Sequence, residues 1–166
     1  MAPRRASRTS LRPLVWTAAA IFVLDQITKV LVVHVAGLAT RGVIEVFPPY
    51  LEFRMAWNQG INFGLMAGEG ALTKWILIAV ALAISAWVVL WMHRERPRRM
   101  AMIAAGLLVG GALGNVVDRL LYGAVADFLN MSCCGIYNPY AFNVADISIF
   151  AGALGLILFT GGKKTA

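Results

Sequence analysis

The sequence has 166 residues, of which 60% are hydrophobic and only 14% are charged, and its net charge is +7. A soluble domain contains about 25% charged residues, whereas a membrane-crossing helix needs roughly 20 predominantly apolar residues. The composition therefore excludes an ordinary soluble domain and predicts one membrane-embedded unit covering residues 1–166.

Four long apolar stretches follow one another along the chain, at about residues 14–35, 72–92, 100–121 and 142–160. Each is about long enough to cross the bilayer as a helix. The first follows an arginine-rich start, as in a secretory signal peptide, but its apolar run exceeds the usual ~7–15 residues of such a peptide. We therefore expect it to be retained, and we expect an all-α integral membrane protein with four transmembrane helices.

Basic residues gather in three segments that would share one side of such a bundle. These residues are Arg4, Arg5, Arg8 and Arg12, then Arg94, Arg96, Arg98 and Arg99, and finally Lys163 and Lys164. The positive-inside rule assigns such segments to the cytoplasm, so both the N and C termini are expected there. The basic excess is then a topology signal, and no nucleic-acid partner is needed to explain it.

The larger segment on the other side, at about residues 43–70, has strand-like character. It contains the runs Val43–Phe47 and Tyr50–Met55, separated by two prolines, and the second run alternates as a half-buried strand does. Glycines punctuate the residues that follow. We expect a small β-sheet on the outer (periplasmic) surface of the membrane.

The smaller outer segment, at about residues 122–142, has no clear periodicity. We expect an irregular connection there, with room for a surface helix. It contains both cysteines of the chain, Cys133 and Cys134. Adjacent cysteines rarely pair with each other because the geometry is poor, and no Cys/His metal spacing exists. We interpret them as two loop thiols without a role.

Polar residues on three of the predicted spans lie at about the same depth. At 1.5 Å per residue, Asp25 lies ~17 Å above the inner end of its helix, Asn115 ~22 Å above that of the third, and Asp146 ~25 Å above Lys163. Ionisable side chains inside a span are costly and usually mark function or a paired structural site. Asp25 and Lys29 are spaced i,i+4 and could satisfy one another, but mutual pairing explains the whole cluster less well. The same cluster includes Asp118, Arg119 and Asn143.

Gly106, Gly110 and Gly114 form a ladder of small residues, four apart, on the third span. Such a ladder is typical of close packing between helices. It would bring Asn115 and Arg119 against neighbouring spans.

The residue types present exclude several chemistries. The two histidines, His34 and His93, are far apart, whereas a catalytic zinc site normally needs about three protein ligands. No nucleophile elbow, P-loop or dinucleotide fingerprint occurs. Two carboxylates held close together can share a proton, and can then activate water and polarise a peptide carbonyl. Asp118, Asp127 and Asp146 are candidates for such a pair, and physical reasoning leaves the choice among them open.

Five short motifs occur in order along the predicted spans. They are Asp25-Gln26-Ile27-Thr28-Lys29, Asn58-Gln59-Gly60-Ile61-Asn62-Phe63-Gly64, Gly114-Asn115-Val116-Val117-Asp118-Arg119, Val125-Ala126-Asp127-Phe128 and Phe142-Asn143-Val144-Ala145-Asp146. Together they resemble the motifs of the bacterial lipoprotein signal peptidases (signal peptidase II), an aspartyl intramembrane peptidase family. Each motif alone is weak, but five in the right order over nearly the whole chain are specific.

The resemblance implies that Asp127 and Asp146 form the catalytic dyad and that Asp118 has a supporting role. It implies that Asn62 departs from the family, which more often has alanine there. The residues expected to line and orient the site are Asp25, Lys29, Asn58, Gly60, Asn115, Arg119 and Asn143.

The resemblance also implies the substrate and the location. Similar enzymes remove the signal peptide of prolipoproteins by cutting just before a cysteine that bears a diacylglyceryl group. We expect such prolipoproteins and membrane lipids as partners, no cofactor or metal, and a monomer in the bacterial cytoplasmic (inner) membrane with its site toward the outer face.

Two other functions fit the polar cluster less well. A small proton-coupled transporter or channel would use intramembrane Asp, Lys and Arg, but these acids gather near one face and no inverted repeat is apparent. A non-catalytic scaffold would use the cluster only for helix assembly.

Overall fold

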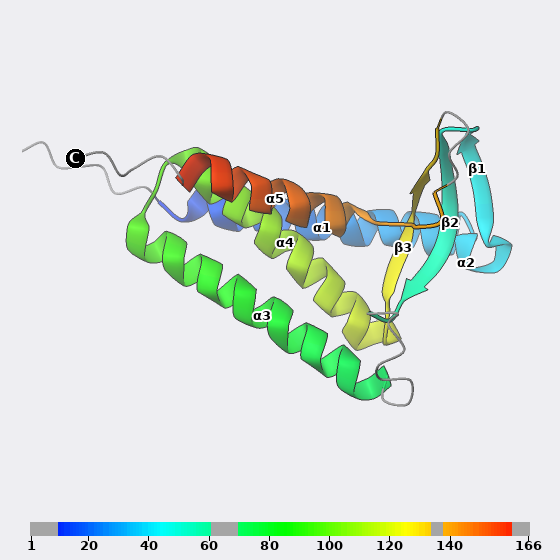
Figure 1. The fold of residues 1–166 in the computed structure, drawn as a ribbon, viewed down its shortest axis with the longest axis horizontal. Coiled ribbons are helices and arrows are strands. Elements are labelled where there is room, and N and C mark those ends of the chain that lie inside the picture. Colours follow the sequence, from blue (N-terminus) through cyan, green and yellow to red (C-terminus); the bar gives the residue numbers. More distant parts are fainter. Residues whose placement is uncertain (1–9, 61–69, 134–137, 161–166) are drawn as a thin grey trace, which may run out of the picture.

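The computed structural model describes residues 10–60, 70–133 and 138–160. It is mostly helical, with the long helices side by side and a small sheet at one end of the bundle (Figure 1). Asn62 and Cys134 lie outside the described residues. Cys133 is disulfide-bonded, so the expectation that it is a loop thiol was wrong. That expectation rested on the rarity of disulfides between adjacent cysteines, which did not exclude a disulfide at this position.

Three helices are long and apolar enough to cross a membrane, and they span Arg12–Val35, Leu72–Glu95 and Arg99–Tyr122. The first consists of α1 (Arg12–Lys29), beginning with a proline in its first turn, and a π-helical continuation, η1 (Val30–Val35). The other two are α3 (Gly70–Glu95) and α4 (Arg99–Tyr122). These helices cover the first three apolar stretches of the sequence to within a few residues, so the helices expected there are confirmed.

The last apolar helix, α5, covers Val144–Thr160 and is shorter, with 17 residues. It begins at Val144 and not at the expected residue 142. The backbone of Phe142 is instead used by a strand, since Phe142 N donates to Leu129 O at 3.0 Å and Phe142 O accepts from Leu129 N at 2.8 Å.

The sheet has three antiparallel strands in the order β1 (Val43–Phe47), β2 (Leu51–Asn58) and β3 (Val125–Met131). The short helix α2 (Leu38–Arg41) leads into it. The hairpin of β1 and β2 confirms the sheet expected in this region. The third strand corrects the expectation of an irregular second segment, because β3 is paired along β2, with Ala56 opposite Asp127.

Helix α4 lies in the middle of the bundle and packs closely on its neighbours (Figure 1). A Cβ atom added at Gly106 would lie 2.6 Å from the carbonyl oxygen of Leu14, and one at Gly110 would lie 2.5 Å from that of Ala18. On another face of α4, Gly152 of α5 sits directly against the backbone nitrogen of Leu108. Only glycine allows such an approach, so the predicted packing role of the ladder is confirmed.

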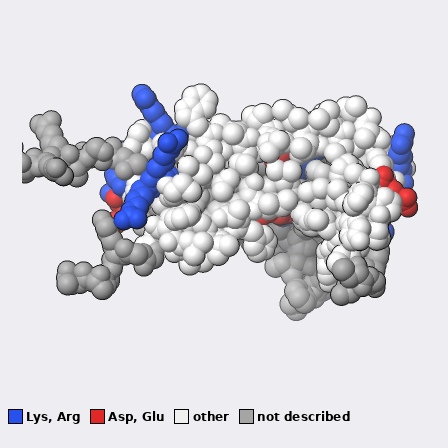
Figure 2. Space-filling model, turned by 90° about the horizontal axis from the view of Figure 1, so that it is seen from above, with Lys and Arg blue, Asp and Glu red and all other residues white. Residues whose placement is uncertain are grey.

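The surface between the two ends of the molecule is almost free of charge. Figure 2 shows Lys and Arg side chains at the two ends and, between them, a mostly white length with only small red and blue areas. Large apolar side chains are exposed on that length, including Trp16 at 73%, Phe150 at 78% and Ile157 at 71%. This surface suits contact with lipid.

Candidate active site

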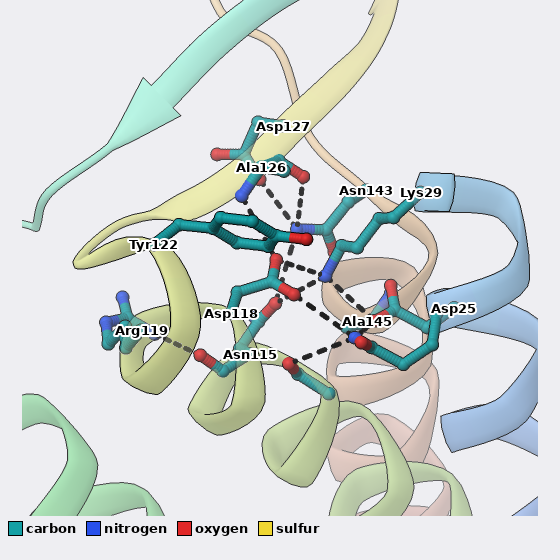
Figure 3. A network of polar contacts seen from close by, with 12 residues as sticks. Asp25, Lys29, Asn115, Asp118, Arg119, Tyr122, Ala126, Asp127, Asn143 and Ala145 are labelled. Carbon is teal, nitrogen blue, oxygen red and sulfur yellow. Dashed lines mark hydrogen bonds and ion pairs between the residues drawn. The ribbon is translucent and has the colours of Figure 1, made fainter. Parts of the chain in front are cut away.

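Lys29 joins two buried carboxylates at the end of the bundle nearest the sheet (Figure 3). Its Nζ atom lies 2.8 Å from Asp25 Oδ2 and 2.7 Å from Asp118 Oδ2, and it donates to Asn115 Oδ1 at 3.4 Å. Asp25 and Asp118 are completely or almost completely buried. Because a buried charge needs a partner, one lysine serves both acids. The predicted pairing of Asp25 with Lys29 is confirmed.

Asp25 and Asp118 also hold the backbone of other elements. Asp25 Oδ1 accepts a hydrogen bond from Ala145 N in the first turn of α5, at 3.0 Å. Asp118 Oδ2 accepts one from Ala126 N in β3, at 3.1 Å. Each acid therefore fixes a point of the chain far from it in sequence.

Asp127 and Asp146 directly follow these two anchored residues, so the backbone beside each is held by a buried acid. Neither of them makes an ion pair with any other residue among those described. Their partners are amide groups: Asn143 Nδ2 donates to Asp127 Oδ1 at 2.6 Å, and Asn115 Nδ2 donates to Asp146 Oδ1 at 2.9 Å. The structure thus separates two acids held by a cation from two acids held by amides.

Asn143 connects the two amide-bound acids and also begins α5. Its Oδ1 atom accepts from Asp146 N at 2.9 Å, and its own N donates to Asp146 Oδ2 at 3.2 Å. This reciprocal pair is a capping box, which satisfies free N–H groups at a helix start. The i,i+3 spacing of Asn143 and Asp146 is therefore the spacing of a helix cap.

Asn58 approaches Asp127 from the sheet. It is the last residue of β2, and its Nδ2 donates to Asp127 Oδ2 at 3.0 Å. Its own Oδ1 accepts from Gly60 N at 2.9 Å. Gly60 has a φ of +105°, and a Cβ there would lie 2.6 Å from Leu77 Cδ1, so the turn that orients Asn58 requires glycine.

The carboxyl group of Asp127 is a weaker acid than that of an ordinary aspartate. Its exposed fraction is only 2%. Burial and the nearby carboxylate of Asp146 raise the pKa of Asp127 from 3.8 to about 7, although hydrogen bonds from Asn58 and Asn143 act in the opposite direction. Two neighbouring acids of this kind tend to keep one proton between them near neutral pH.

Arg119 lies at the edge of the polar network (Figure 3). Its Nη1 donates to the backbone oxygen of Asn115 at 3.3 Å, and its Nε is buried and has no hydrogen-bond partner among the described residues. The carboxylates of Asp127 and Asp146 are close enough to act on its charge. This i,i+4 contact within α4 is made to the backbone and not between the two side chains.

The sequence analysis did not assign a role to Gln26. Its Nε2 donates to Asp25 Oδ2 and to Asp118 Oδ1, each at 3.1 Å, so it links the two acids that share Lys29. Only its place in the first motif indicated it. Within residues 10–60, 70–133 and 138–160, no three His, Cys, Asp or Glu side chains are grouped as metal ligands would be.

Comparisons with known proteins show to which family the chain belongs. A family model described as Signal peptidase (SPase) II matches residues 17–160. A lipoprotein signal peptidase of Methylobacterium sp. (strain 4-46) is 41% identical over 90% of this chain and 91% of its own. One of Rhodopseudomonas palustris (strain ATCC BAA-98 / CGA009) is 40% identical over 81% of this chain and 83% of its own. A solved bacterial membrane enzyme is 28% identical, with a TM-score of 0.76 over 95% of this chain and 97% of that one. The chain belongs to the signal peptidase II family.

Proposed function

We propose that this protein is a membrane aspartyl endopeptidase that removes the signal peptide from prolipoproteins, cutting just before a cysteine that bears a diacylglyceryl group. Membership of the signal peptidase II family and the relatives named lipoprotein signal peptidase support this activity. The geometric support is that Asp127 and Asp146 are held together by amides while the neighbouring acids are bound to Lys29. The transporter considered above gains no support.

In the proposed reaction, Asp127 and Asp146 share one proton. Asp146 is the more exposed of the two and takes a proton from water, whose oxygen attacks the scissile carbonyl carbon. Asp127, with a pKa of about 7, gives its proton to the carbonyl oxygen. The tetrahedral intermediate then breaks its C–N bond as the leaving nitrogen takes the proton from Asp146, and a hydroxyl proton returns to Asp127. No covalent enzyme intermediate forms.

The surrounding residues act in this proposal as positioning residues. Asn58 and Asn143 each donate to one oxygen of Asp127, which fixes the plane of its carboxyl group. Asn115 does the same for Asp146 and is itself held by Lys29. Arg119 has a buried Nε that donates to no described residue, and in this proposal it is the donor to a substrate carbonyl oxygen.

We also propose that α5 is a fourth span and that the site faces the outside of the bacterial inner membrane. A helix of 17 residues is about 25 Å long, which is close to the thickness of the hydrocarbon core. Arginines gather at the end of the bundle away from the sheet (Figure 2), and basic residues favour the cytoplasmic side. A green fluorescent protein fused after residue 166 should therefore stay in the cytoplasm and be fluorescent. A dark, exported fusion would contradict the proposed topology.

The activity is tested with the purified protein in a neutral detergent and a chelator. The substrates are one prolipoprotein with a diacylglyceryl cysteine and the same chain without the lipid. We expect cleavage of the lipidated chain only, with the new N-terminal cysteine identified by mass spectrometry. An intact lipidated substrate, or a cut elsewhere, would contradict the proposed function, provided that the protein still melts cooperatively.

A further inference from the structure

A cavity lies where α3 and α5 end and α4 begins, and these ends are at the end of the bundle opposite the sheet (Figure 1). Its volume is about 650 Å³, and it is formed by the last turns of α3 and α5 and the start of α4. Its lining combines charged side chains, those of Glu95, Arg96 and Arg98, with apolar ones such as Trp91, Met92 and Phe159.

Arg96 is held in place by the end of its own helix. Its Nε donates to the carbonyl oxygen of His93 at 2.8 Å, and its Nη2 lies 3.1 Å from His93 Nδ1. The residue has a φ of +46°, which turns the chain out of α3. The guanidinium is therefore fixed at the cavity before any ligand arrives, which reduces the entropy lost on binding.

Arg98 is the second cation of the cavity. It immediately precedes α4, and its backbone oxygen accepts hydrogen bonds from Ala101 N and Met102 N, whereas its side chain does not cap that helix and is hydrogen-bonded to no residue that the structure describes. The cavity lining thus carries two guanidinium groups and one carboxylate, that of Glu95. The last carbonyls of α3 and α5 carry partial negative charge at this same end, and the first N–H groups of α4 carry partial positive charge. The full positive charges at the cavity come from the arginine side chains.

The apolar side chains that line the cavity are continuous with the exposed apolar surface of α3 and α5. Trp91 stacks on Trp87 with ring centroids 5.5 Å apart. Trp87 lies one turn before Trp91 in α3, away from the cavity, and is 63% exposed. On the other side, Leu158 of α5 lines the cavity and is 65% exposed. A ligand with a charged group and long apolar chains would contact both parts.

We propose that this cavity binds the phosphodiester headgroup of an anionic glycerophospholipid, with its acyl chains on the apolar faces of α3 and α5. Basic pockets between helices on the cytoplasmic side suit such headgroups. The start of a signal peptide is positively charged, so the two arginines would repel it. A free phosphate ester would leave the apolar lining uncovered.

The test measures lipid binding to the purified protein in neutral detergent by native mass spectrometry. The probes are phosphatidylglycerol, phosphatidylcholine with the same acyl chains, and glycerol 3-phosphate. The variants are Arg98→Gln, the double variant Arg96→Gln/Arg98→Gln, and Arg12→Gln as a matched control, since Arg12 is exposed at the same end but does not line the cavity. Thermal melting of each variant shows that it is folded.

We expect phosphatidylglycerol to bind at least fivefold more tightly than phosphatidylcholine, and glycerol 3-phosphate not to bind. Arg98→Gln should weaken phosphatidylglycerol binding about fivefold, and the double variant about 30-fold, because each basic residue near an anionic lipid contributes about 1 kcal/mol. Arg12→Gln should change little. Equal binding of both lipids, equal loss in Arg12→Gln, or tight binding of glycerol 3-phosphate would overturn the proposal. So would unchanged phosphatidylglycerol binding in Arg98→Gln together with weaker prolipoprotein binding, which would assign the cavity to the signal peptide.

Discussion

Replacing Asp127 by asparagine should make the protein more stable while abolishing the proposed activity. The side chain is 2% exposed, and burial together with the charge of Asp146 makes ionisation unfavourable in the folded chain. Asparagine is nearly the same size and carries no charge. It keeps one oxygen that can accept from Asn58 or Asn143, but its amino group replaces the other acceptor.

The size of the effect follows from the pKa of Asp127 in the two states. Below pH 3.8 the carboxyl is protonated in both folded and unfolded chains and contributes no difference. Between pH 3.8 and about 7 the unfolded chain ionises while the folded chain keeps its proton, so stability falls as the pH rises. At about 1.4 kcal/mol per pKa unit, the penalty reaches about 4 kcal/mol above pH 7. The lost acceptor offsets part of it, so we expect a net gain of about 1–3 kcal/mol.

The assay is thermal unfolding of the purified wild type and Asp127→Asn in the same detergent at pH 5 and pH 8. The variant should melt several degrees higher at pH 8, and the difference should shrink at pH 5. Asp118→Asn is the matched control, because it breaks the ion pair with Lys29 and should lower the melting temperature at both values. If Asp127→Asn is no more stable than wild type at pH 8, or its gain is the same at pH 5, the pKa assigned to Asp127 is refuted.

Three further predictions test other parts of the structure. The rate of cleavage should decline as the pH rises through about 7, because the dyad loses the proton held with Asp127; a pH–rate profile that stays flat to pH 9 would contradict this. Lys29→Met should lower the free energy of unfolding by about 3–5 kcal/mol, since it leaves two buried acids without their cation, whereas Lys74→Met, away from the cluster, should not. Gly110→Ala should prevent α1 and α4 from packing together stably, because its Cβ would lie 2.5 Å from Ala18 O. The control Gly123→Ala meets no atom within 4 Å and should cost only about 1 kcal/mol for its φ of +79°. Equal melting temperatures of the two variants would contradict the close contact at Gly110.

The long helices could be predicted from the sequence because lipid requires uninterrupted apolar residues over the whole width of the bilayer. The depth of the polar residues could be predicted for the same reason, since helix geometry converts sequence position into height. That three spans carry their acids at one level was therefore visible before any contact was known.

The third strand could not be predicted in this way. β3 is buried along nearly its whole length, so its sequence lacks the alternation that indicated β2. Its extended state depends on pairing with β2, some 70 residues earlier in the chain, as in the register of Ala56 with Asp127. Local sequence contains no signal for such a partner.

The different partners of the acidic residues could also not be predicted from the sequence. Sequence position placed Asp118 at the level of Asp146, and only the contacts show that Asp118 is bound to Lys29 and to the backbone of Ala126. The choice of Asp127 and Asp146 as the dyad came from the resemblance to the family. It remains a proposal, and the amide partners of both residues support it.

The most direct test compares cleavage of a diacylglyceryl prolipoprotein by wild type, Asp127→Asn, Asp146→Asn and Asn115→Asp, in a chelator and after each protein is shown to be folded. Cleavage by the wild type, with loss of at least about 10³-fold in both aspartate variants, is the expected result for a dyad in which each carboxyl moves a proton. Asn115→Asp is the control variant: it retains both dyad members but adds a third acidic side chain beside Asp146. Its rate of cleavage should be lower than that of the wild type but not abolished. Full activity of either Asp127→Asn or Asp146→Asn would contradict the assignment of these two residues as the catalytic pair.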